Sequence, residues 1–381
     1  MNDINFFVFL MNLAITVLCG SFFLIVPSLT RKSYLFGIKI PEAEHGCEEA
    51  KALKKSFLTI CVAGMVVVAA IAAMQYAMAP GYSLVGSLYY PLLLPLVYLL
   101  AYVPNWSKAR SLKESRGWEV SATSFAETKS AYERESLAIV PWGWHIAALV
   151  VLAASFAVSV ARYPSLPDVI PTHFDINMNP DAWSAKSWGT VLSMPIINFS
   201  CFAVYLAVGI GIVKAKMQLS PENPALSFAQ QRVYRIRMGA ALGLLSLFST
   251  CAMAALGLST IFDFKAPFWL VISSFLVPCA VLVAVTVASG QGGFKIKIKE
   301  PLDEPQARNN RSKGVSDDKF WRIGMFYCNY DDPAIMVEDR FGTGFGFNYA
   351  RLPVKLGAII SIAALVGMYI WLTAVMAGKA L

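Results

Sequence analysis

The chain has 381 residues, of which 57% are hydrophobic and 15% are charged. A soluble domain carries roughly 25% charged residues, so this composition excludes a soluble globular protein. The formal net charge is +8 at pH 7, and the positions of the basic residues decide which partner that charge suits.

Eight segments of the sequence are long and apolar enough to cross a bilayer, which takes about 20 apolar residues. They cover residues 4–27, 57–79, 83–103, 142–160, 190–213, 238–259, 267–288 and 354–377. The predicted fold is therefore an all-α polytopic membrane protein with about eight transmembrane helices.

The basic residues alternate from one connection to the next. Of the 32 Lys and Arg residues, 28 lie in connections 28–56, 104–141, 214–237 and 289–355. Cytoplasmic loops are enriched in basic residues, so the pattern predicts that both termini lie outside the cytoplasm. The positive charge then faces anionic lipid headgroups, and direct binding of nucleic acid is not predicted.

The predicted spans and connections divide the chain into five regions. These are three helices with two basic cytoplasmic loops (1–141), a helix–loop–helix unit (142–213), helices six and seven (214–288), a cytoplasmic insertion (289–353) and a terminal helix (354–381).

The predicted spans are nearly free of ionisable residues, which usually mark ion or proton pathways. His145, beside Trp142 and Trp144, is expected to be an interfacial ring, with a proton relay as the alternative. Asn198 is expected to hydrogen-bond a neighbouring helix. An ion-driven transporter is therefore disfavoured.

One polar connection, "LPDVIPTHFDINMNPDAWSAKS" (166–187), lies on the predicted outer side between spans four and five. Its prolines disfavour helix, so loop 161–189 is expected to be an ordered, extended lid. His173 and Asp175 are two residues apart, which points their side chains the same way in an extended segment. Trp183 and Trp188 are typical of a membrane interface.

Three interpretations of this loop stay open. In the first, His173 and Asp181 hydrogen-bond backbone groups and hold the loop's shape. In the second, His173, Asp175 and Asp181 bind a divalent metal, for which two ligands at this spacing are a weak signal. In the third, the loop recognises an external molecule. No other cofactor is predicted.

The same stretch, followed by "MPIIN", resembles the domain of unknown function 1648, which is characteristic of SdpI-type membrane proteins. The resemblance implies immunity to a secreted membrane-active toxin, with relay to a cytoplasmic regulator in some members. Asn179 stands where that family usually has glycine, and asparagine tolerates a positive φ there. The residues singled out for ligand recognition or loop structure are Pro171, His173, Phe174, Asp175, Pro180, Asp181, Trp183 and Lys186.

The cytoplasmic insertion has three predicted parts. "FKIKIKE" (294–300) alternates in polarity, which favours a short basic strand or a membrane-surface segment. Residues 300–318 are polar and are expected to form a flexible linker. "AIMVE" and "FGFNYA" flank a turn near "DRFGTG", which predicts a β-hairpin packed at the membrane surface. On a strand, Gly342, Gly344 and Gly346 would share one face.

The last of these parts resembles a second family, the domain of unknown function 5808, for which no activity is implied. The residues that carry this resemblance and are taken as candidate module residues are Trp321, Tyr327, Asn329, Asp332, Arg340 and Asn348. Together, the two resemblances suggest a multi-pass protein of a bacterial plasma membrane.

The sequence thus leads to a non-enzymatic hypothesis, in which a membrane immunity or sensing protein meets a secreted peptide or envelope molecule through loop 161–189. Two alternatives stay open. One is a transporter or flippase for an amphipathic substrate, which a lateral cavity between spans would favour. The other is a membrane metalloenzyme that uses His173, Asp175 and Asp181.

Overall fold

The computed structural model describes residues 2–118, 139–175, 177–220, 223–262, 264–298 and 317–378. Within them the chain is mostly helical, and six helices are long and apolar enough to cross a membrane. This confirms a multi-pass α-helical protein. The six are Asn5–Leu29, Glu48–Met78, Trp142–Ser165, Trp188–Lys214, Ala225–Ser259 and Phe268–Ser289. Helices α3 (Ser83–Arg116) and α9 (Leu352–Gly378) cover the two other predicted segments.

The chain folds into two compact units, and each is described by itself. The first comprises Met1–Ser124, Lys216–Pro224 and Ala307–Leu381, and the second comprises Phe125–Ala215 and Ala225–Gln306. The short segment Lys216–Pro224 therefore belongs to the first unit, although helices of the second unit precede and follow it in the chain.

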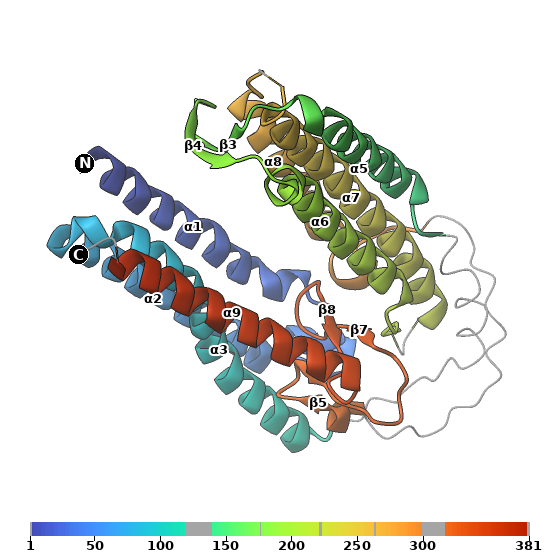
Figure 1. Ribbon diagram of the computed structural model, residues 1–381. Coiled ribbons are helices and arrows are strands. Elements are labelled where there is room, and N and C mark those ends of the chain that lie inside the picture. Colours follow the sequence, from blue (N-terminus) through green and yellow to red (C-terminus); the bar gives the residue numbers. More distant parts are fainter. Residues whose placement is uncertain are drawn as a thin grey trace. The chain divides into compact units, whose positions relative to one another are not determined.

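The second unit is a bundle of α5 (Trp142–Arg162), α6 (Trp188–Lys214), α7 (Pro224–Ser259) and α8 (Phe268–Ser289) (Figure 1). The Ser187 hydroxyl caps α6 by accepting from the Thr190 amide. Asn198 Nδ2 donates to the Thr250 carbonyl at 3.1 Å and joins α6 to α7, as predicted. His145 is 2% exposed on α5, with its ring centre 6.4 Å from that of Phe202.

The first unit contains α1 (Asn2–Leu29), α2 (Glu48–Met78), α3 and α9. The rings of Phe9 and Tyr76 stack at 4.8 Å and hold α1 against α2. After α1, the chain forms a buried hairpin of β1 (Tyr34–Leu35) and β2 (Ile38–Lys39). A short 3₁₀ helix follows Pro41 at Glu42–Gly46, and α2 begins at Glu48.

The C-terminal module, defined as residues 317–351, carries β5 (Trp321–Arg322), β6 (Phe326–Tyr327), β7 (Met336–Glu338) and β8 (Phe345–Phe347). The predicted hairpin is β7–β8, with Met336 opposite Phe347 and Glu338 opposite Phe345. Gly344 and Gly346 lie on one face, where a Cβ on either residue would clash with the Asp339 carboxylate.

A second close approach ties this module to the β1–β2 turn. Gly37 and Gly324 both have positive φ values, +75° and +68°. A Cβ on either residue would clash with the backbone of the other segment. Glycine meets both demands because it has no side chain.

Of the two alternatives for 294–300, the strand is wrong for the residues that the structure describes there, 294–298, which form turn and coil. The Lys295 amide turns back to the Ser289 carbonyl at 3.0 Å. The Gln230 side chain donates to the carbonyls of Phe294 and Ile296. These bonds take the backbone groups that a strand would pair. Most of the predicted linker, residues 300–316, lies outside the described residues.

Candidate functional site

The loop between α5 and α6 forms an antiparallel hairpin of β3 (Val169–Phe174) and β4 (Pro180–Ala185) (Figure 1). Pro171 lies opposite Trp183, and Phe174 lies opposite Pro180, with register irregularities on both sides of His173. Buried Leu166 and Ile170 pack against Val191 of α6. The prediction of an ordered, extended segment is thus realised as a paired hairpin.

His173 and Asp181 meet across this hairpin. His173 Nδ1 and Asp181 Oδ1 are 2.5 Å apart, and the side chains remain 70% and 47% exposed. A pair this exposed contributes little to folding because water screens it. The same exposure leaves the imidazole and the carboxylate within reach of an external molecule.

Asp175 has a different task at the hairpin tip. Its carboxylate accepts from the amides of Asn177 and Asn179, both at 2.8 Å. The Asn179 amide, followed by that residue's side chain, holds the pKa of Asp175 below its usual value. Lys265 Nζ reaches Asn179 Oδ1 at 2.5 Å. The tip is therefore a fixed turn.

The positive φ expected at Asn179 lies instead at Met178, with a φ of 60°. The Met178 amide donates to the Asp175 carbonyl at 2.9 Å and closes the turn one residue earlier. The Met178 side chain is 6% exposed, and its burial accompanies a backbone conformation that methionine rarely adopts.

Lys186 and the aromatic residues hold the base of the hairpin. Lys186 Nζ donates to the Leu166 carbonyl at 2.7 Å and lies 5.6 Å from the Tyr163 ring centre. Tyr163 in turn stacks on Trp188 at 3.7 Å. Trp183, on β4, is 57% exposed. Lys186 thus has a structural position, and Trp183 offers an open aromatic surface.

Among the residues that the structure describes, no group of three or more His, Cys, Asp or Glu side chains is placed to hold a metal ion. The hairpin brings His173 and Asp181 together, which supplies two donors. Asp175 is bound to the tip backbone.

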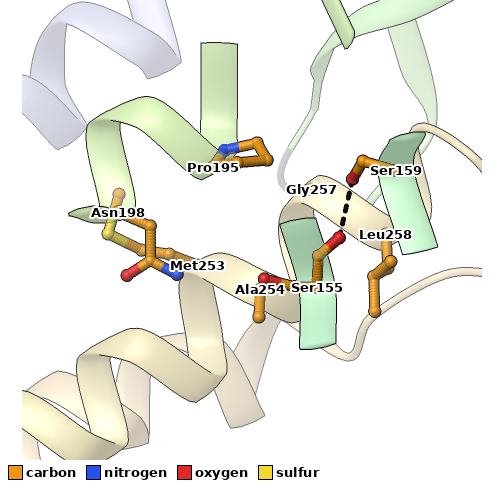
Figure 2. A pocket seen from close by; sticks show the side chains of 8 residues that line it. All are labelled: Ser155, Ser159, Pro195, Asn198, Met253, Ala254, Gly257 and Leu258. Carbon is orange, nitrogen blue, oxygen red and sulfur yellow. Dashed lines mark hydrogen bonds between the residues drawn. The ribbon is translucent and has the colours of Figure 1, made fainter. Parts of the chain in front are cut away.

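A small cavity lies between α5, α6 and α7, near the hairpin ends of the first two helices. Figure 2 shows its eight lining residues, Ser155, Ser159, Pro195, Asn198, Met253, Ala254, Gly257 and Leu258. It leaves about 10 Å³ for the centre of a water-sized sphere, which is the room that one water molecule needs. An external peptide cannot enter it, so the hairpin surface is the candidate recognition site.

The candidate residues of the C-terminal module form one hydrogen-bonded cluster. Asn348 Nδ2 donates to the carbonyls of Asn329 and Asp332 at 2.9 and 3.0 Å. The Tyr327 hydroxyl donates to Asp332 Oδ2 at 2.7 Å. Trp321 packs on Tyr327 with ring centres 5.1 Å apart.

Arg340 lies at the centre of the same module and is 0% exposed. Its Nη1 donates to Asp318 Oδ1 at 2.5 Å, and its guanidinium lies 4.7 Å from the Trp321 ring centre. Lys113, near the end of α3, bonds the other oxygen of Asp318 at 2.6 Å. The arginine therefore organises the module's interior.

The connecting segment, residues 216–220 between α6 and α7, is built into this module. The Lys216 amide donates to the Met336 carbonyl at 2.9 Å, and Lys216 Nζ meets Asp332 Oδ2 at 2.5 Å. The Gln218 carbonyl accepts from Arg31, whose guanidinium also pairs with Glu338 at 2.8 Å. Three distant stretches of chain thus share one buried polar network.

Two aspartates of the module have shifted pKa values. Burial acts to raise the pKa of Asp332, but hydrogen bonds from Lys216, the Ala334 amide and Tyr327 outweigh it and lower the pKa. Burial, followed by the nearby charge of Glu338, raises the pKa of Asp339 to about 7. The ionised Asp332 holds the connecting segment, whereas Asp339 changes charge near neutral pH.

Two family models match parts of the chain. One, described as a domain of unknown function (DUF1648), matches residues 150–199. The other, described as a family of unknown function (DUF5808), matches residues 331–355. Both agree with the predicted domain composition. The first spans the hairpin and the adjoining halves of α5 and α6, and the second begins after Trp321, Tyr327 and Asn329. No curated protein and no solved structure matches the chain.

Proposed function

We propose that this chain is an immunity or sensing protein of a bacterial plasma membrane. Its β3–β4 hairpin, within loop 161–189, recognises a secreted membrane-active peptide or another envelope molecule. The observation that carries the proposal is the exposed His173–Asp181 pair on a hairpin whose tip and base are fixed. In the proposed topology, eight helices cross the membrane, both termini lie outside, and the hairpin faces outward.

The chemistry of the hairpin suits a cationic amphipathic ligand. Membrane-active amphipathic peptides carry Lys and Arg on one face and apolar side chains on the other. Asp168 and Asp181 present exposed carboxylates, and Trp183 presents an exposed ring. Tryptophan offers a large contact area with few rotatable bonds. The hairpin thus offers both a charged and an apolar contact.

The connecting segment supports an inward branch of the same function. It directly follows α6, which begins three residues after β4 ends. Its Lys216 side chain and Gln218 amide are held by Asp332 and Glu338 of the C-terminal module. Arg31, which pairs with Glu338, donates to the Gln218 carbonyl. In the proposed topology, this segment and the module lie in the cytoplasm, where a regulator can bind them.

The test is survival of cells challenged with a panel of cationic membrane-active peptides. Cells that express wild type are compared with cells that lack the protein and with cells that express the triple variant His173→Ala/Asp181→Ala/Trp183→Ala. Thr172→Ala is an exposed control on the same hairpin. Membrane abundance is matched by immunoblot. We expect wild type and the control to protect, and the triple variant to lose protection.

Other outcomes of this test argue against the proposal in different ways. Protection by the triple variant would return the hairpin to a structural role and overturn recognition through it. Absence of protection by wild type against every peptide would overturn the immunity function. Asp175→Asn separates shape from contact, since it weakens the tip without touching the exposed pair.

One observation favours a second candidate, a transporter or flippase for an amphipathic substrate. An open, apolar surface depression lies between the start of α5 and α7, lined by Pro141, Gly143, Trp144, Ala147 and Leu247. An uncharged lateral depression suits an acyl chain. Exchange of fluorescent lipids between leaflets of proteoliposomes would test this candidate, and exchange no faster than in protein-free vesicles would remove it.

A further inference from the structure

The C-terminal module has an outward face that its hydrogen-bond network does not use. Trp321 pairs with Tyr327 across β5 and β6, and Tyr327 bridges to Asn348 beside β8. These three side chains are buried. Because side chains alternate along a strand, the neighbours Arg322, Phe326 and Phe347 lie on the opposite face, where they are exposed.

This face lies beside the first turn of α9. The ring of Phe326 is 5.6 Å from that of Tyr349, and Tyr349 precedes the start of α9 at Leu352 by three residues. Lys355, in the first turn of α9, has its Nζ 5.3 Å from the Tyr330 ring centre. Tyr330 is 69% exposed. The aromatic residues are therefore grouped around the base of this helix.

The sequence of helix α9 is apolar at nearly every position, and its large apolar side chains are exposed over a broad face. Those at least half exposed are Leu352, Leu356, Ile359, Ile360, Ile362, Val366 and Ile370. A helix that is apolar all round is stable in a membrane. Its first turn then lies at the membrane–water interface, where aromatic and basic side chains are enriched.

We propose that Phe326, Tyr330 and Phe347, with Arg322 and Lys355, form an interfacial anchor that seats the C-terminal module in anionic lipid headgroups. The rings lie at headgroup depth, and the two cations face lipid phosphates. This inference rests on the topology proposed above, in which α9 spans the membrane, and is independent of what the β3–β4 hairpin recognises.

The first experiment measures depth in the membrane. The seven native cysteines are replaced by alanine, and a single fluorophore is placed by Phe347→Cys, by Ile359→Cys on α9, or by Glu114→Cys near the end of α3. Each protein, checked for a single folded species, is reconstituted with phosphatidylcholine and phosphatidylglycerol. Nitroxide-labelled lipids quench either near the headgroup or near the bilayer centre.

We expect the label at 347 to be quenched most strongly by the headgroup nitroxide and the label at 359 by the central one. The label at 114 should respond to neither. If 359 is quenched and 347 behaves like 114, the anchor is overturned while the topology stands. If 359 is not quenched by either lipid, the topology and the anchor both fail.

The second experiment uses wild type and tests the charge of the lipid. Amide hydrogen exchange of residues 322–330 is compared in nanodiscs with and without phosphatidylglycerol. We expect several-fold slower exchange with the anionic lipid, and loss of that difference in Arg322→Gln/Lys355→Gln. Equal exchange in both lipids would overturn the role of the cations, and this readout does not depend on a labelled variant folding.

Discussion

The β3–β4 hairpin and the C-terminal module use similar polar groups in opposite environments. The His173–Asp181 pair is 70% and 47% exposed, whereas the Arg31–Glu338 pair is 6% and 2% exposed. Water screens the first pair, so its net contribution to folding is small. A buried pair leaves an uncompensated charge when one partner is removed, which is costly. Polar residues therefore form an exposed surface on the β3–β4 hairpin, whereas in the C-terminal module they form buried interactions that hold its segments together.

The largest effect that this contrast predicts is at Arg340. Arg340→Met leaves Asp318 with Lys113 as its remaining cationic partner and removes the fully buried cation beside Trp321. Breaking a buried pair costs about 3–5 kcal/mol, so we expect a marked fall in the thermal midpoint of the detergent-solubilised protein. Arg322→Met, at an exposed arginine of the same module, is the control. Equal midpoints for the two variants would show that burial does not decide the cost.

Lys216 should have a smaller effect, because its side chain is 42% exposed while its partner Asp332 is 7% exposed. In Lys216→Met, the carboxylate keeps the bonds from Tyr327 and the Ala334 amide. We expect a loss of about 1–3 kcal/mol and faster proteolysis of the connecting segment. Exposed Lys214, two residues earlier on α6, serves as the matched control. Unchanged proteolysis in Lys216→Met would mean that the backbone bonds alone hold the segment.

Asp339 predicts a pH dependence with a definite sign. Burial, followed by the charge of Glu338, raises its pKa from 3.8 to about 7. Between these values the folded protein keeps a proton that the unfolded chain releases, so its contribution to the unfolding free energy falls as pH rises. Above about pH 7 that contribution no longer changes. The unfolding free energy of Asp339→Asn should therefore increase relative to that of wild type as pH rises from 4 to 7.

Wild type must be compared with the Asp339→Asn variant because His45 makes stability change with pH in the opposite direction to Asp339. Burial, followed by the charge of Lys54, lowers the pKa of His45 to about 4. Its contribution to stability is lost as pH falls below the ordinary histidine value near 6.5. The thermal midpoints of wild type and Asp339→Asn are measured across this range, with exposed Asp331→Asn as the control. Parallel curves for wild type and Asp339→Asn would contradict the prediction.

The sequence predicted the helices better than it predicted the polar networks. Apolar length is a local property, so each of the eight apolar segments coincides with a helix in the structure. The β7–β8 hairpin is also local, since its strands flank a glycine-containing turn. Loop 161–189 was recognised as ordered because its prolines and the family pattern lie within a few residues of one another.

What the sequence could not show depends on residues far apart in the chain. Lys216 and Asp332, or Arg31 and Glu338, carry no common motif, and only the fold brings them together. Because no motif links these residues, the sequence predicted only a basic cytoplasmic connection at 214–237, which includes the connecting segment. At the hairpin tip, Met178 takes the positive φ instead of Asn179, because local propensity is overruled where a side chain is buried.

The smallest effect on stability, and the most informative for function, is predicted at His173. Since the imidazole is mostly exposed and its partner Asp181 remains hydrated, His173→Ala should change the unfolding free energy by less than about 1 kcal/mol. Protection from a membrane-active peptide should nevertheless fall, because the contact surface is lost while the fold remains. The paired measurements are the thermal midpoint in detergent and survival at matched abundance. A large drop in the thermal midpoint would show that His173 stabilises the fold. The contrast between the exposed hairpin pair and the buried pairs of the C-terminal module would then no longer hold.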